Sequence, residues 1–380
     1  MRELVQLGGI PVAPVRPVPE SGPMADGFGR RIEYLRISVT DKCNLRCVYC
    51  MPEEGLPWLR RDEILSYEEI AEVVRVMAGV GLRKIRITGG EPLVRRDLPA
   101  LVRMIRAVPQ IEDVALSTNA VLLEEHADEL RDAGVDRVNV SLDSLRPDRI
   151  DAISRRAGSA EAIFRGLAAA ERAGFAPIKV NCVVMRGRND DEVADFAAIT
   201  RERPWHVRFI EVMPTGDNLG VSADEFVSSD EILRNVRRIG DLQPVRGPAG
   251  NGPARYFALP GAAGTVGVIT PMSHNYCERC NRMRLTADGQ LRPCLFGDLQ
   301  TDLRDPLRRG EPLRFSERGL KEIVRTVVLP FWNALSFFTT YAEVDGFDPR
   351  RASAPATTIR QNIAMRSRTP WTRGTGITPP

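Results

Sequence analysis

Short apolar runs alternate with helical patterns through the first half of the chain. The runs lie at 34–40, 84–89, 113–119, 137–143, 178–185 and 206–213. Between them, segments such as SYEEIAEVVRVMAGVG (66–81) and AEAIFRGLAAAERAG (160–174) place apolar residues at the spacing of an amphipathic helix. Continuous apolar runs of this length are typical of parallel strands that are buried on both faces. The pattern therefore predicts six βα-type units.

A series of βα units winds in one direction, so we expect either an open doubly wound sheet or a partial barrel. Both architectures put the active site at the carboxyl ends of the strands. Polar residues lie at those ends in DKCNLRCVYC (41–50), TGGEP (88–92), STN (117–119), SLD (141–143) and EVMP (211–214). Each taken alone indicates a turn, a cap or a strand-end hydroxyl. Their shared edge favours a common functional site.

The repeat stops after Pro214, and the rest of the chain differs in character. We expect a flexible, proline-rich leader at 1–28 in place of a signal peptide, the repeat domain at 29–214, a second domain at 215–329 and a divergent tail at 330–380. The second domain should contain a helix near SSDEILRNVRRI (228–239) and strands at RYFAL (255–259) and GTVGVIT (264–270). The tail has six arginines and no acidic residue from 350 to 380, which predicts disorder.

Composition narrows the setting of the protein. Its 380 residues are 43% hydrophobic and 27% charged, as in a soluble globular protein, and no apolar run approaches the ~18 residues of a membrane span. A formal charge of +3 argues against a nucleic-acid-binding surface. Of the 53 basic residues only four are lysines, and arginine is the better bidentate ligand for phosphate.

The seven cysteines form two tight groups and a singleton. One group is Cys43, Cys47 and Cys50, and the other is Cys277, Cys280 and Cys294. This clustering indicates a metal and a reducing compartment, which we take to be the cytoplasm, and it is unlike the spread of disulfide cysteines. Cys182 lies alone in the apolar run IKVNCVVM, so we expect a buried core thiol.

The first cysteine group is short of one ligand for zinc, which prefers four. A [4Fe–4S] cluster needs one ligand per iron, and a short loop with three cysteines would leave the fourth iron open to a ligand that is not protein. For the second group, His274 completes a Cys3His zinc set as an alternative. His126 and His206 have no partners at ligand spacing, so we interpret them as packing or surface residues.

CNLRCVYC (43–50) resembles the CxxxCxxC loop of radical S-adenosylmethionine (SAM) enzymes, in which the open iron binds SAM and reductive cleavage yields a 5′-deoxyadenosyl radical. The stretches LRISVTDKCNLRCVYCMP, IRITGGEPLVRRDL, VNVSLD, KVNCVV, VRFIEVMPTG and CxxCxRxRLxxDGxxxxCLF are together similar to the GTP 3′,8-cyclase family of molybdenum cofactor synthesis, over about residues 25–325. The resemblance implies an incomplete (β/α)6 TIM-like barrel with a smaller C-terminal α+β domain.

The resemblance also assigns site residues and cofactors. It implies two [4Fe–4S] clusters, the first held by Cys43, Cys47 and Cys50 and the second by Cys277, Cys280 and Cys294. It implies SAM-binding positions at the Tyr49 backbone, Gly90, Ser141 and Met213. The implied GTP-contact positions are Arg36, Arg86, Ser117, Lys179, Arg282 and Arg284, with Lys84 and Arg208 as weaker candidates. A phosphate-binding GxxxxGK[ST] loop is absent from the sequence, so side chains would have to neutralise the triphosphate.

The activity implied is that of a lyase that removes the 3′-hydrogen of GTP and joins the ribose carbon to C8 of guanine. An external electron donor, a downstream cyclic pyranopterin monophosphate synthase and a homodimer follow from the same resemblance. No general acid or base is assigned. Two alternatives remain: a silenced paralogue that binds clusters and nucleotide without turnover, and a radical SAM enzyme that modifies a peptide.

The sequence departs from the family pattern at three places. Ser117 stands where threonine is usual, which retains the hydroxyl. Ala120 replaces the glycine of TTNG, a change expected to matter only if the turn needs a positive φ. The family ends in a Gly-Gly tail that reaches the active site, whereas the printed sequence ends TRGTGITPP. If the tail matters here, we expect SAM cleavage to survive while cyclisation is weak or absent.

Overall fold

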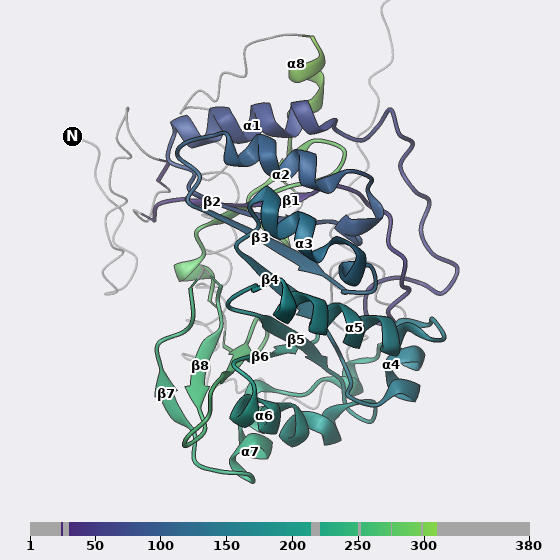
Figure 1. The fold of residues 1–380 in the computed structure, drawn as a ribbon, viewed down its shortest axis with the longest axis vertical. Coiled ribbons are helices and arrows are strands. Elements are labelled where there is room, and N and C mark those ends of the chain that lie inside the picture. Colours follow the sequence, from purple (N-terminus) through teal and green to yellow (C-terminus); the bar gives the residue numbers. More distant parts are fainter. Residues whose placement is uncertain are drawn as a thin grey trace, which may run out of the picture. The chain divides into compact units, whose positions relative to one another are not determined.

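The computed structural model describes residues 24–25, 30–213, 221–249, 252–274, 276–297 and 299–309 (Figure 1). The expected leader, apart from 24–25, and the expected tail at 330–380 lie outside the described residues, as does the predicted domain boundary at 214. Residues Met1–Val327 form one compact unit. No helix within the described ranges is long and apolar enough to cross a membrane.

Six parallel strands at the centre of the sheet confirm the six predicted strands. They are β1 (Tyr34–Ser38), β2 (Lys84–Thr88), β3 (Asp113–Thr118), β4 (Arg137–Ser141), β5 (Lys179–Val184) and β6 (His206–Glu211). Each pairs in parallel with the next strand along the chain, without a reversal of order. A doubly wound sheet would reverse its order at a switch point. The fold is therefore the incomplete, TIM-like barrel.

Helices follow these strands in the order that the sequence pattern predicts (Figure 1). They are α1 (Tyr67–Gly79), α2 (Leu98–Arg106), α3 (Leu123–Ala133), α4 (Pro147–Ser154), α5 (Ser159–Arg172) and α6 (Val193–Glu202). The start of α1 is encoded locally: Ser66 Oγ accepts a hydrogen bond from the Glu69 amide at 3.1 Å, and Glu69 Oε2 accepts one from the Ser66 amide at 2.6 Å.

The residues that follow Pro214 extend the same sheet at both edges. The strand β9 (Thr265–Ile269) pairs in parallel with β6, and β10 (Arg282–Leu285) pairs in parallel with β1. Antiparallel strands complete the two edges: β8 (Arg255–Ala258), β7 (Gln243–Val245), β11 (Gln290–Arg292) and β12 (Thr301–Asp302). The predicted helix near 228–239 is α7 (Ser229–Arg237), and α8 (Arg304–Arg308) is the last described element.

The two faces of the central strands differ because side chains alternate along a strand. Leu35 and Ile37 of β1 and Ile85 of β2 have no exposed surface and belong to the main apolar core. The intervening residues, such as Arg36 and Arg86, turn to the opposite face and line a cavity. One face of the strands therefore holds the helices in place, and the other carries the polar side chains.

Candidate active site

A cavity of about 310 Å³ lies on the polar face of the strands. Most of the residues expected at the site from the sequence line it: Arg36, Cys43, Cys47, Tyr49, Cys50, Arg86, Gly90, Ser117, Ser141, Arg208, Met213, Arg282 and Arg284. Lys84, Lys179 and the three cysteines of the second group do not line it. The named residues come from six strands, β1 to β4, β6 and β10, or from the loops that follow them, and they meet in one place.

The first cysteine loop is shaped by backbone hydrogen bonds. The Cys50 amide donates to the Cys47 carbonyl at 2.9 Å, which closes a tight turn. The Arg46 and Val48 amides donate to the carbonyls of Ser154 and Ile153, each at 2.9 Å. Hydrogen bonds therefore hold the loop against the end of α4, and a tight turn shapes it at Cys47–Cys50. All three of its cysteines line the cavity.

Gly90 shows why the TGGEP segment needs glycine at this point. A Cβ atom at Gly90 would lie 2.3 Å from the Lys42 carbonyl oxygen and 2.5 Å from that of Asp41. The Glu91 amide also donates to the Lys42 carbonyl at 2.8 Å. The glycine thus lets the end of β2 press directly against the backbone that leads into Cys43.

The environment of the first cysteine group favours neutral thiols in the absence of a metal. Burial raises the pKa of Cys43 and Cys50, and it raises the pKa of Cys47 well above the ordinary value. The charges of Asp143 and the neighbouring sulfurs act on Cys47 in the same direction. A cationic iron–sulfur core supplies the charge that such buried thiolates need, and thiolates are the ligands it prefers. The donor set fits a cluster.

The second cysteine group borders the cavity. Cys277 begins a short 3-10 turn, in which the Cys280 amide donates to the Cys277 carbonyl at 3.1 Å. Burial raises the pKa of Cys277, and the nearby sulfurs of Cys294 and Cys280 raise it further, so the three thiols lie close enough to interact. Tyr276 and Leu295, which flank the group, line the cavity.

The zinc alternative for the second group gains no support. The ring of His274 pairs through Nε2 with Asp230 Oδ2 at 3.2 Å. Within the described ranges, no three His, Cys, Asp or Glu side chains are placed to hold a single metal ion. A [4Fe–4S] cluster differs from zinc in this respect because each thiolate binds a separate iron.

Arginines form a row across three neighbouring strands. Arg284, Arg36 and Arg86 are register partners on β10, β1 and β2. Burial lowers the pKa of Arg36 and of Arg86 to about 10, and neighbouring arginines contribute to both shifts. The Nε atoms of Arg86, Arg208 and Arg282 are buried without a hydrogen-bond partner. Buried, mutually repelling cations with unused donors are suited to a polyanionic ligand.

Arg208 and Lys179 extend the cationic surface on β6 and β5. Arg208 Nη2 donates to Asn139 Oδ1 at 2.8 Å, and Asn139 Nδ2 donates to the Leu116 carbonyl at 3.0 Å, so a buried amide fixes the guanidinium. Lys179 is buried beside the cavity, where its Nζ donates to the Ala249 carbonyl. Burial, followed by the charge of Arg208, lowers the pKa of Lys179 to about 6.

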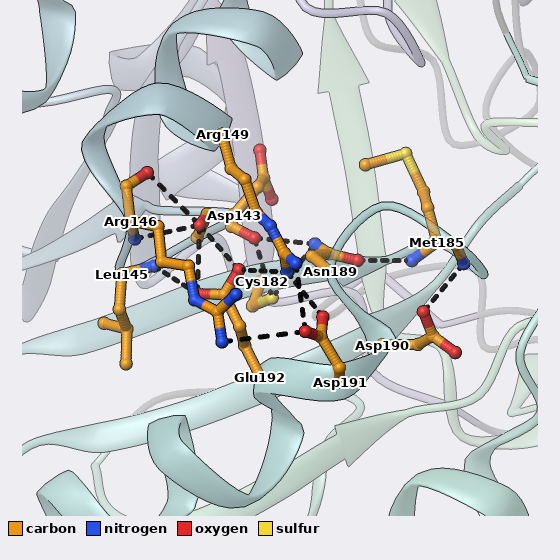
Figure 2. A network of polar contacts seen from close by, with 12 residues as sticks. Asp143, Leu145, Arg146, Arg149, Cys182, Met185, Asn189, Asp190, Asp191 and Glu192 are labelled. Carbon is orange, nitrogen blue, oxygen red and sulfur yellow. Dashed lines mark hydrogen bonds and ion pairs between the residues drawn. The ribbon is translucent and has the colours of Figure 1, made fainter.

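Asp143 is an acidic residue at the end of β4, in the SLD segment, to which no role was assigned from the sequence. Asp143 Oδ2 accepts a hydrogen bond from Tyr49 Oη and Oδ1 accepts one from the Val183 amide, each at 2.8 Å. Burial raises the pKa of Asp143 to about 6. Figure 2 shows Asn189 beside it, donating to the Asp143 carbonyl at 2.6 Å. Asp143 therefore joins the cysteine loop to β5.

Glu192 anchors the other side of the network in Figure 2. Its buried carboxylate accepts from Ser144 Oγ at 2.7 Å, from the Leu145 amide at 2.7 Å and from Arg149 Nη1 at 2.9 Å. The turn that follows Asp143 is thereby tied to the segment that follows β5. No motif pointed to Glu192, because its partners lie more than 40 positions away in the chain.

Glu91 is the third acidic residue for which the sequence indicated no role. Its buried carboxylate accepts from Thr118 Oγ1 at 2.7 Å, from the Asn119 amide at 2.6 Å and from the Leu93 amide at 3.1 Å. Burial raises the pKa of Glu91 to about 7. Asn119 Nδ2 in turn donates to Asn44 Oδ1 at 2.7 Å. The ends of β2 and β3 and the cysteine loop are thus held together by side chains.

Cys182, His206 and Ala120 were also singled out in the sequence. Cys182 is 1% exposed, which confirms a buried thiol. His206 is half-buried, with Nδ1 2.7 Å from Thr265 Oγ1. Ala120 has φ 64°, so the turn does require a positive φ at the position where the family carries glycine.

Comparison with known proteins agrees with this geometry. Residues 37–199 match the model of the radical SAM superfamily, and residues 205–329 match the model described as Molybdenum Cofactor Synthesis C. A GTP 3′,8-cyclase of Pelotomaculum thermopropionicum is 53% identical over 292 residues, which are 77% of this chain and 90% of that protein. A GTP 3′,8-cyclase of Moorella thermoacetica is 50% identical over 289 residues, 76% of this chain and 89% of that protein.

Among solved structures, the SAM-bound SuiB of Streptococcus suis has a TM-score of 0.53 and 13% identity over 76% of this chain and 67% of that chain. A second SuiB structure, bound to the precursor peptide SuiA, gives the same TM-score with 12% identity. At this level of identity the likeness concerns the fold alone.

Proposed function

Because the chain belongs to the GTP 3′,8-cyclase family of radical SAM proteins, we propose that it is a lyase that converts GTP to (8S)-3′,8-cyclo-7,8-dihydroguanosine 5′-triphosphate. This reaction is the first step of molybdenum cofactor synthesis. The observation that carries the proposal is the single cavity that a CxxxCxxC loop and five arginines line together. The cysteine loop suits radical chemistry, and the arginines suit a triphosphate.

Cys43, Cys47 and Cys50 hold the first [4Fe–4S] cluster, and the Tyr49 backbone, Gly90, Ser141 and Met213 surround SAM. When bound, this pair supplies a hydrogen-abstracting radical through one-electron reductive cleavage of SAM. Support for the placement comes from the shared cavity and from the rigid attachment of the loop to α4. Asp143 fixes the Tyr49 side chain, so the loop keeps one geometry while the cofactor binds.

Arg36, Arg86, Arg282 and Arg284 neutralise the triphosphate of GTP, with Ser117, Arg208, Lys179 and Lys84 in supporting positions. The row of register partners offers donors from three strands along one line. The guanidinium groups of Arg36 and Arg86 are already buried, so little water screens their interaction with an anion. The chain's contribution to the reaction is therefore to bind, orient and shield the nucleotide.

Cys277, Cys280 and Cys294 would hold a second [4Fe–4S] cluster in a smaller C-terminal α+β domain at 215–329, and this cluster would supply an iron site for the purine. Two observations support this assignment: the sulfurs of Cys294 and Cys280 raise the pKa of Cys277, and Tyr276 and Leu295 lie on the cavity wall. Arg282 and Arg284 lie on β10, which begins two residues after Cys280, so the nucleotide would bind next to the cluster along the chain.

The remaining assignments rest on family membership. An external electron donor reduces the first cluster, and a cyclic pyranopterin monophosphate synthase consumes the product. We place the protein in the cytoplasm because its clustered cysteines require a reducing compartment. A homodimer is the expected assembly.

Anaerobic reconstitution tests the proposal. The full chain is loaded with iron and sulfide, and reductant, SAM and GTP are added while 5′-deoxyadenosine and the cyclised nucleotide are measured. We expect both products, in a ratio near one. Formation of 5′-deoxyadenosine without cyclised product, despite GTP binding, would identify the silenced paralogue. Absence of GTP binding would overturn the proposal and favour a peptide substrate.

A further inference from the structure

A fully buried carboxylate lies at the end of β6. Glu211 is the last residue of that strand and has no exposed surface. It precedes Met213 of the cavity wall by two residues. The loop from 270 to 274, which leads to Cys277, lies against the same carboxylate. The Glu211 side chain thus lies between the cavity wall at Met213 and the loop that leads to the second cysteine group.

Four donors surround Glu211, and all of them are neutral. Oε1 accepts from the Ser229 amide at 2.8 Å and from Ser273 Oγ. Oε2 accepts from the amides of Met272 and Ser273, each at 3.0 Å. Within the described ranges, no lysine or arginine forms an ion pair with this carboxylate. The charge is offset by hydrogen bonds and by the amino end of α7 alone.

Further contacts fasten the same loop to α7. Ser229 Oγ lies 3.0 Å from Ser273 Oγ, and His274 Nε2 lies 3.2 Å from Asp230 Oδ2. Within the loop itself, Thr270 Oγ1 donates to the His274 carbonyl at 2.7 Å. Glu211 is the member of this group that belongs to the central strands.

The strand β6 is held by its neighbours in the sheet, whereas the 270–274 loop depends on side-chain contacts. β6 is paired on both sides, with β5 and with β9, so the position of Met213 depends on the barrel. The loop at 270–274 leaves the sheet after Ile269 and turns toward Cys277 through Met272 and Ser273. Loss of the carboxylate would release this loop and leave the strand in place.

We propose that Glu211 is a positioning residue that fixes the second cysteine group, and the nucleotide bound beside it, relative to the SAM side of the cavity. The proposal rests on the proposed function, because it assigns the two sides to GTP and SAM. Glu211 touches neither ligand and acts through Met272 and Ser273. Loss of Glu211 should therefore weaken GTP binding and lower the yield of cyclised product per 5′-deoxyadenosine, while SAM binding is retained.

Glu211→Gln is the informative substitution because it keeps the size of the side chain. Glutamine has one acceptor oxygen where glutamate has two, and its amide group would face donors that need an acceptor. Ser273→Ala is a milder variant that removes one donor and leaves three. Glu231→Gln is the matched control, since Glu231 lies on α7 but pairs with Arg186 at 2.8 Å instead of the 270–274 loop.

The experiment uses the reconstituted full chain in all four forms. Amide hydrogen exchange of the segments around 229 and 270–274 is measured first, followed by iron content, the KM values for GTP and SAM, and cyclised product per 5′-deoxyadenosine. For Glu211→Gln we expect exchange at these amides, and KM for GTP, to rise about tenfold, the order of one unsatisfied buried donor. KM for SAM and iron content should stay at wild-type values, and Glu231→Gln should match wild type.

Two outcomes would overturn the inference: exchange that rises while KM for GTP and product per 5′-deoxyadenosine are unchanged, or exchange that does not rise. If Glu211→Gln fails to fold or to retain iron, Ser273→Ala must show the same changes in smaller measure, and wild-type behaviour in that variant contradicts the inference. Failure of the proposed function is a separate result. It would appear as a wild-type protein that makes no cyclised nucleotide.

Discussion

Lys179 should take up a proton when GTP binds. Its pKa in the free protein is about 6, because burial and the charges of Arg208, Arg137 and Arg86 disfavour the ammonium form. At pH 7.5 such a lysine is only about 3% protonated. A triphosphate brings negative charge to the cavity that Arg208 and Arg86 line. The ammonium form then becomes favourable, and the proton must come from solvent.

The size of the effect follows from Coulomb's law. A unit charge about 7 Å from Nζ, at an effective dielectric constant near 20, contributes about 2.4 kcal/mol, or roughly 1.7 pKa units. Two phosphate charges at that range would raise the pKa of Lys179 from about 6 to about 9. Uptake at pH 7.5 is then about 0.9 proton, and GTP affinity falls about eightfold for each unit rise in pH.

Titration calorimetry in buffers of different ionisation enthalpy measures this uptake directly. Lys179→Arg is the control, because arginine stays protonated in the free protein and keeps the charge. Subtracting the variant from wild type also removes proton release by the GTP phosphate. Equal uptake in the two proteins, within about 0.2 proton, would refute the reasoning. Without GTP, the same lysine makes the free energy of unfolding rise with pH, whereas GTP affinity falls with pH. Above about pH 6 the unfolded chain holds a proton on Lys179 that the folded protein has lost.

Removing single residues should separate the other parts of the site. Cys43→Ala should lower iron content by about half and abolish 5′-deoxyadenosine formation while GTP binding persists in calorimetry; retained SAM cleavage would contradict the assignment. Cys280→Ala should also halve the iron, but with SAM cleavage retained and cyclised product absent from chromatography. Asn139→Ala frees the Arg208 guanidinium, so the dissociation constant for GTP should rise about tenfold with SAM binding unchanged; an unaltered constant would exclude this anchoring role. Ala120→Gly should change the free energy of unfolding by less than about 1 kcal/mol in denaturant titration.

The sequence pattern predicted the six central strands because short, largely apolar runs that alternate with helical patterns are typical of buried parallel strands, although only one face of these strands is apolar. It also placed the strand ends at one edge, where the structure has its cavity. The pattern did not predict that β9 and β10 would extend the sheet at both ends. Those contacts join β10 to β1 across some 250 positions, and no local periodicity carries such information.

The first cysteine group and the arginines were selected because their residue types have a specific chemistry. Glu91, Asp143 and Glu211 lie in strand-end segments of the predicted site but received no role, and Glu192 lies outside every motif. An isolated acidic residue in a sequence indicates a solvated surface, and its hydrogen-bond partners become visible only when distant segments meet. For Glu211 the nearest partner along the chain is Ser229, 18 positions away. The residues that carry the chemistry of the site lie in short sequence motifs. The hydrogen bonds that hold them in place join segments that are distant in the sequence.

Position 120 shows how a departure from a family pattern can be neutral in energy. A non-glycine residue with φ 64° costs about 1–2 kcal/mol relative to glycine. Against this, the Ala120 methyl group is fully buried, which contributes about 0.8 kcal/mol, and alanine restricts the unfolded chain by a further 0.4–1 kcal/mol or so. The opposing contributions nearly cancel, so Ala120→Gly should be almost silent. Gly166 of α5, which packs against Ala120, does not tolerate a larger side chain. A Cβ at Gly166 would lie 2.2 Å from the Ala120 carbonyl oxygen, so Gly166→Ala must displace α5 and should strongly lower the free energy of unfolding. A large loss of stability in Ala120→Gly, or none in Gly166→Ala, would show that the turn and α5 are not packed as described.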